Sequence, residues 1–106
     1  MENKSIILYK LLNKNEEFPV ASSHDKPETV REQVKSALAA NGPVEVDLAN
    51  MRSLSPSFAY EAFGKLYDDF GDQVAERLVF KNDPRGLHTR ILNALLRRRE
   101  ILRPQN

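Results

Sequence analysis

The segment that most constrains the fold is VEVDLANMRSLSPSFAYE, residues 44–61. Apolar and acidic residues alternate over 44–48, which indicates a short strand with one buried face. Ser55 and Pro56 then form a typical helix start, because a serine hydroxyl can cap free backbone N–H groups and proline is tolerated in the first turn. A strand, a short loop and a helix in this order indicate an α/β unit.

Three helices are predicted around this segment. Apolar residues recur at helical spacing over 27–38, and the Asn-Gly-Pro sequence at 41–43 ends that helix. We expect Ser22–Asp25 to supply its capping residues. A second apolar stripe runs from Ala59 to Phe70, where Gly71 ends the helix, and a third begins near residue 87 and stops before Pro104.

Strands account for the remaining apolar runs. Residues 5–12 predict a strand that returns through a turn into a second, edge strand near Phe18 and Val20. Residues 76–81 predict a further core strand. The expected order is therefore β-β-α-β-α-β-α, with a mixed β-sheet of about four strands and about three helices covering it mainly on one side.

The length and composition fit one small domain spanning residues 1–106. Hydrophobic residues make up 41% of the chain and charged residues 29%, which is typical of a soluble globular protein. No apolar run approaches the ~20 residues of a membrane helix, and the first residues lack a secretory signal. The chain has no cysteine. We therefore expect a cytoplasmic protein; its oligomeric state stays open.

The charge distribution does not favour nucleic acid as the main partner. The formal net charge is +1, but the chain from Gln73 onward holds 8 basic and 3 acidic residues. Three consecutive arginines on a helix point in different directions, and few aromatic residues lie among them for stacking bases. Binding of nucleic acid by this basic last helix is a weak alternative. The basic cluster consists of Arg97, Arg98, Arg99 and Arg103.

The chemistry of the side chains does not point to an enzyme. His24 and His88 stand alone, and the four glycines are scattered rather than gathered in a phosphate-binding loop. We expect no metal and no cofactor. The main alternative to a protein-binding role is an anion or nucleotide site at the ends of the central strands, with Arg85 and Arg90 as its cationic residues. Asp47 ends one strand there, but the role we favour for it is structural, in which it accepts N–H groups of the following loop or closes a turn.

The helix start at 55–61 is the candidate interaction surface. Ser55 is the expected cap, and Ser57 in the first turn is accessible to a kinase, because a helix N-terminus stabilises a phosphate. Both serines could instead serve only as caps. Phe58 is either a core residue or an exposed anchor for a partner. The predicted partner contacts are Arg52, Ser55, Ser57, Phe58 and Glu61.

These same residues carry a family resemblance. An apolar strand ending in Val-Asp-Leu, a short spacer and then Leu-Ser-Pro-Ser-Phe-Ala-Tyr-Glu-Ala-Phe resembles the STAS-like domains related to bacterial anti-sigma factor antagonists, in a branch of uncharacterised function. The similarity continues through Arg-Leu-Val-Phe-Lys-Asn at 77–82 and the final helix. It implies a small mixed sheet with the helices mainly on one side.

The resemblance also implies a function. Such domains are non-catalytic signalling modules that bind a partner, often a histidine-kinase-like ATPase, through this loop and the following helix. In some of them the kinase phosphorylates a serine at the helix start, and the added charge breaks the complex. Counted from Asp47, the acceptor position is Pro56, which cannot be phosphorylated. Transfer of that role to Ser57 or Ser55 is a hypothesis.

Overall fold

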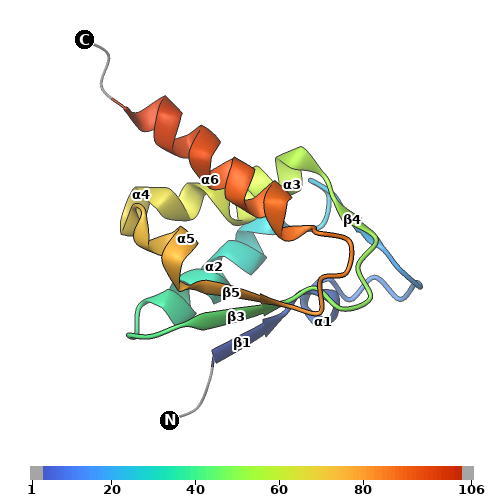
Figure 1. Ribbon diagram of the computed structural model, residues 1–106. Helices are drawn as coiled ribbons and strands as arrows, with labels where there is room; N and C mark the ends of the chain where they lie inside the picture. Colours follow the sequence, from blue (N-terminus) through green and yellow to red (C-terminus); the bar gives the residue numbers. More distant parts are fainter. Residues whose placement is uncertain (1–3, 104–106) are drawn as a thin grey trace.

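A three-stranded sheet lies beneath a layer of helices in the computed structural model, which describes residues 4–103 (Figure 1). The strands are β1 (Lys4–Ile7), β3 (Val44–Asp47) and β5 (Leu78–Lys81), in the order β1-β3-β5. Both pairings are parallel. The chain must therefore cross from one end of the sheet to the other between strands, and the helical segments make these crossings.

One face of this sheet forms the floor of the core. Val46 in the central strand pairs with Ile6 on one side and Phe80 on the other. Val44 and Val46 are fully buried, whereas Glu45 and Val79, which point to the opposite face, are partly exposed. Figure 1 shows the helices α2 to α6 on one side of the sheet, as the sequence predicts.

Two of the predicted helices are confirmed almost residue for residue. α2 spans Pro27–Leu38 and α6 spans His88–Leu102. Each has an apolar stripe that faces the core. The predicted cap of α2 is wrong, because Asp25 accepts hydrogen bonds from the Ser22 N–H (2.7 Å) and Lys14 Nζ (3.1 Å) instead. The buried residues of the two helices are Pro27, Val30, Val34, Leu38, Ile91, Ala94 and Leu95.

The predicted hairpin at residues 5–20 is wrong. Ile7 pairs with Asp47, the last residue of β3, so the chain beyond Ile7 has no strand to pair with and turns into the helix α1 (Leu8–Leu12). The next strand, β2 (Val20–Ala21), pairs in parallel with β4 (Ser53–Leu54) in a separate two-stranded sheet. The described pairings are all parallel. The mixed sheet of about four strands is thus replaced by these two parallel sheets.

The predicted helix over residues 55–70 is interrupted. It divides into α3 (Pro56–Ala62), a 3₁₀ turn η1 (Gly64–Leu66) and α4 (Tyr67–Phe70). The turn lies against α6, and a Cβ atom on Gly64 would lie only 2.9 Å from the carbonyl oxygen of Ala94. A further helix, α5 (Gln73–Arg77), occupies the start of the predicted strand at 76–81. Packing against α6 therefore overrides the continuous helical pattern.

Candidate functional site

The predicted interaction surface lies where β4 leads into α3, and we call residues 52–57 the β4–α3 corner. Two backbone hydrogen bonds attach it to the β2 region. The Arg52 N–H donates to the Pro19 carbonyl at 3.0 Å, and the Ser55 N–H donates to the Ala21 carbonyl at 2.8 Å. These two hydrogen bonds, one before and one after β4, therefore fix the backbone of the corner to the β2 region.

The two serines of the corner have different environments. The Ser55 hydroxyl accepts a hydrogen bond from the Phe58 N–H at 3.1 Å, which confirms Ser55 as the cap of α3. The Ser57 hydroxyl lies 3.2 Å from that of Ser55, and its side chain is exposed. Ser57 thus offers a hydroxyl to solvent, while the Ser55 oxygen is engaged with the backbone.

Phe58 is a core residue and not an exposed anchor. Its side chain is fully buried, together with Phe63 and Leu66 further along the same segment. A partner bound to the folded domain cannot contact it, so the prediction that Phe58 is a partner contact is wrong. The sequence placed it at the edge of the apolar stripe, and only the packing around α3 shows which way its side chain points.

Glu61 faces α2. Its carboxylate pairs with Lys65 Nζ at 2.9 Å and with Arg31 Nη1 at 3.7 Å, and the same Arg31 guanidinium donates to the Glu61 carbonyl oxygen. These contacts join α2 to α3. Arg52, by contrast, is exposed. Of the predicted contacts, Arg52 and Ser57 are therefore exposed, Ser55 is partly exposed, and Glu61 belongs to a salt-bridge network.

The two arginines of the predicted anion site lie at different hollows: Arg85 contacts Phe18 at the strand ends, and Arg90 lines a hollow between α3 and α6. Asp47 accepts hydrogen bonds from the Ala49 N–H (2.9 Å) and from Asn82 Nδ2 (3.1 Å), which confirms its role in the turn. Arg85 lies over the ring of Phe18, 5.7 Å from the ring centre, and Arg90 belongs to α6. The hollow at this edge has a volume of ≈ 350 Å³ and a lining of Tyr9, Glu17, Phe18 and Asn50.

The N-terminus of α6 is already bonded to a carboxylate of the chain. Asp83 accepts hydrogen bonds from the backbone N–H groups of Leu87 (2.7 Å) and His88 (3.0 Å), and it lies 2.6 Å from His88 Nδ1. Burial opposes ionisation of Asp83, but the hydrogen bonds from His88 and Leu87 outweigh it and lower the pKa. Sequence reasoning does not find this role, because the N–H groups that Asp83 accepts lie four and five residues further along the chain, beyond the spacing of an ordinary helix cap.

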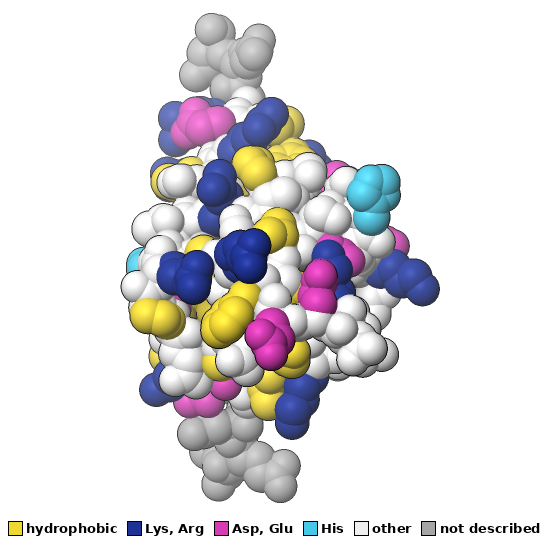
Figure 2. Space-filling model, turned by 90° about the vertical axis from the view of Figure 1, so that its right-hand side faces the viewer, with side chains coloured by type: hydrophobic (Ala, Val, Ile, Leu, Met, Phe, Trp, Pro, Cys, Tyr) yellow, Lys and Arg dark blue, Asp and Glu magenta, His cyan; other side chains and the backbone are white. Residues whose placement is uncertain are grey.

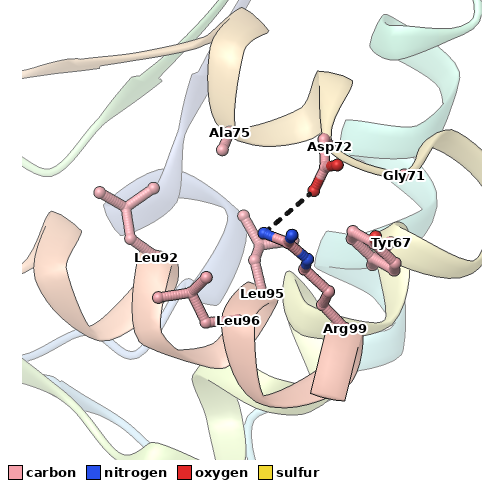
Figure 3. Close-up of a pocket in the computed structure, with 8 residues that line it drawn as sticks. All are labelled: Tyr67, Gly71, Asp72, Ala75, Leu92, Leu95, Leu96 and Arg99. Carbon is pink, nitrogen blue, oxygen red and sulfur yellow. Dashed lines mark ion pairs between the residues drawn. The ribbon is translucent and has the colours of Figure 1, made fainter. Parts of the chain in front are cut away.

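The basic cluster of α6 does not form one surface. Arg98 makes two 2.7 Å hydrogen bonds to the carboxylate of Asp68, and these bonds lower the pKa of Asp68. Arg99 pairs with Asp72 at 3.8 Å across an apolar pocket of ≈ 220 Å³ formed by α4, α5 and α6 (Figure 3). Because its charges are divided among separate partners, this helix lacks the continuous basic surface that backbone contacts to nucleic acid need.

Metal centres and membrane spans are two further classes of site. Within residues 4–103, no three His, Asp or Glu side chains lie close enough together to hold a metal ion. None of the helices in this range has the length and apolar character needed to cross a membrane.

Comparison with known proteins identifies the family. A family model described as a STAS-like domain of unknown function (DUF4325) matches residues 28–83, which run from the first turn of α2 to the loop after β5. The β4–α3 corner lies inside this match and α6 lies outside it. No curated protein and no solved structure matches the chain significantly. Because the match covers more than half of its 106 residues, the chain belongs to the family of STAS-like domains of unknown function.

Proposed function

We propose that this domain is a non-catalytic regulatory module of the cytoplasm that binds a partner protein through the β4–α3 corner. The observation that carries the proposal is the arrangement of Arg52, Ser55 and Ser57. A charged side chain and a hydroxyl are exposed on a backbone that is held by hydrogen bonds on both sides and by the Ser55 cap. A surface ordered before binding loses little conformational freedom when a partner binds.

The partner we propose is a histidine-kinase-like ATPase, which the family resemblance implies. The chain belongs to a STAS-like family, and the proposed surface lies within the residues that the family model matches. Ser57 is the residue at which added charge would regulate the complex. Its hydroxyl is exposed in the first turn of α3, where a phosphate would be accessible to a kinase and would add negative charge to the proposed surface.

The test is a titration of the purified domain with the histidine-kinase-like ATPase encoded nearest to it, by isothermal titration calorimetry. We expect Ser57→Asp to weaken binding about tenfold, since it adds a charge to the interface, and Ser57→Ala to bind like the wild type. Ser36→Asp is the matched control, because it adds the same charge at an exposed serine of α2.

A second pair of variants tests the arginine. Arg52→Gln should weaken binding, whereas Arg103→Gln, which removes the same charge at the far end of α6, should not. Equal affinity for the wild type, Arg52→Gln and Ser57→Asp would show that this corner is not the interface. Failure of the wild-type domain to bind the ATPase would remove that class of partner.

A further inference from the structure

A small groove lies between α3 and α6, next to the β4–α3 corner. Its volume is ≈ 130 Å³. Pro56 belongs both to the corner and to the lining of the groove, so the two surfaces are continuous. We call it the α3–α6 groove, and its lining residues are Pro56, Tyr60, Arg90, Asn93, Ala94 and Arg97.

The two arginines of this groove differ from the other arginines in α6 and directly after it. Arg98, Arg99 and Arg103 each pair with a carboxylate, at 2.7, 3.8 and 3.6 Å. Arg90 and Arg97 are exposed, and neither forms an ion pair with any carboxylate of residues 4–103. The groove therefore presents two positive charges that the described part of the domain does not neutralise.

Tyr60 holds one of these charges in place. The guanidinium carbon of Arg97 lies 5.6 Å from the centre of the Tyr60 ring, which is the geometry of a cation–π contact. The Tyr60 hydroxyl in turn accepts a hydrogen bond from Arg98 at 3.1 Å. Since Arg98 is itself fixed by Asp68, the ring under Arg97 is anchored. Arg97 is thus positioned before a partner arrives.

Two further arginines without a carboxylate partner lie near the β4–α3 corner. Arg52 and Arg85 are exposed and have no carboxylate partner among the described residues. Both contact the segment at Phe18 and Pro19. Arg85 lies over the Phe18 ring, and the Arg52 N–H donates to the Pro19 carbonyl. Figure 2 shows Lys and Arg side chains beside hydrophobic ones in the middle of the face that carries β4 and the loop before α6.

We infer that the α3–α6 groove binds an acidic segment of the partner protein, a conclusion that rests on the proposed function and specifies the chemistry of its partner. Arg90 and Arg97 are two helical turns apart, which separates them by about 10 Å along α6. A polyproline II segment has three residues per turn and places residues i and i+3 on one side about 9 Å apart, and a helix places residues i and i+7 on one side about 10 Å apart. Two carboxylates at either spacing can each pair with one arginine.

The shape and charge of the groove favour a protein over a nucleic acid. A volume of ≈ 130 Å³ admits one or two side chains. Binding to a nucleic acid backbone needs a run of cationic contacts. On α6, however, Arg98 and Arg99, which follow Arg97 directly, are already paired with Asp68 and Asp72. Two charges at a fixed spacing suit a pair of carboxylates better than a row of phosphates.

The experiment selects binders to the purified domain from random peptides displayed on phage, and then measures the affinity of the enriched peptides by fluorescence anisotropy. We expect enrichment of paired Asp or Glu residues at i and i+3 or at i and i+7. The double variant Arg90→Gln/Arg97→Gln should lose about tenfold or more in affinity for them. The double variant Arg99→Gln/Arg103→Gln removes the same charge from α6 and should bind like the wild type.

Each of the following results would overturn the inference. The selection could yield no acidic consensus, or the acidic peptides could bind both double variants equally. A random-sequence single-stranded oligonucleotide could also outcompete the acidic peptides at the wild-type groove, which would make it a nucleic acid site. The selection could instead yield peptides without acidic residues that bind the wild type but do not bind Ser57→Asp. That result would overturn this inference and leave the proposed function standing. By contrast, acidic peptides that bind while the ATPase does not would overturn only the proposed partner.

Discussion

The carboxylate of Asp83 lies 2.6 Å from His88 Nδ1, and the side chain of Asp83 is only 7% exposed. It also accepts the N–H groups of Leu87 and His88, so one side chain joins the loop after β5 to the first turn of α6. Both carboxylate oxygens take part in these contacts, and protonation would turn one of them from an acceptor into a donor. Stability should therefore depend on the ionisation of Asp83.

The pH dependence of unfolding tests this relationship. Because the folded state lowers the pKa of Asp83 below its ordinary value of 3.8, Asp83 stabilises the fold fully above that value, and the contribution is lost as the pH falls through the lowered pKa. Asp83→Asn should cost about 1–2 kcal/mol at pH 7, measured by urea unfolding. The difference from the wild type should shrink below about pH 4.

Asp69→Asn is the control for that experiment. Asp69 is exposed and its ion pair with Lys35 (3.3 Å) lies at the surface, so this substitution should change the free energy of unfolding by less than about 1 kcal/mol. A gap between the wild type and Asp83→Asn that stayed constant from pH 7 to pH 3 would contradict the role of the ionised carboxylate.

The two serines of the β4–α3 corner should separate a structural role from an interaction role. Ser55→Ala removes the cap of α3 and should lower the free energy of unfolding by about 1 kcal/mol. Ser57→Ala should change it by less than about 0.5 kcal/mol, since the Ser57 side chain is exposed. Thermal unfolding of the two variants measures both values. Equal losses would mean that Ser57 also supports the helix start.

Gly64 should tolerate no side chain. An alanine Cβ at this position would lie 2.9 Å from the Ala94 carbonyl oxygen and 3.3 Å from a ring carbon of Tyr60. The backbone of η1 and that of α6 would have to separate, so Gly64→Ala should destabilise by about 1–3 kcal/mol. Without the close approach, alanine would stabilise a helical turn by about 0.5–1 kcal/mol. The sign of the change in the free energy of unfolding, measured by urea unfolding, therefore shows whether the backbones of η1 and α6 are in close contact at Gly64.

A pair of phenylalanines tests the placement of the core. Phe58→Ala should cost about 3–5 kcal/mol, because the side chain is fully buried. Phe18 is 46% exposed and contacts Arg85, so Phe18→Ala should cost about 1 kcal/mol or less. Chemical denaturation of the two variants compares them directly. A small loss for Phe58→Ala would contradict its burial and return it to the candidate surface.

The features that the sequence predicted well depend on contacts between residues close together in the chain. The Ser55 cap joins residues three apart, and the Asp47 turn includes a hydrogen bond to Ala49, two residues away. The apolar spacing of α2 and α6 is local in the same sense. Such features follow from side-chain type and spacing alone, and the strand β3 and the helix start at Ser55 lie where the sequence predicts them, although the short strand β4 (Ser53–Leu54) interrupts the predicted loop.

The predictions that failed depend on distant partners. The strand expected at 5–12 stops at Ile7 because β3 stops at Asp47, and β2 pairs with β4 more than thirty residues away. The break at Gly64 comes from α6, thirty residues later. The direction of the Phe58 side chain could not be predicted from the sequence either, since it depends on what packs against α3.

The sequence by itself determined that this chain is a small α/β domain with a capped helix start at Ser55, and the family resemblance rested on that local pattern. The tertiary structure decided which residues of that segment are available to a partner. It buried Phe58, joined Glu61 to Arg31 and Lys65, and brought Arg90 and Arg97 beside Pro56 and Tyr60. The physical reason is that capping and helical spacing act within a few residues, whereas burial and charge pairing depend on which elements meet in space.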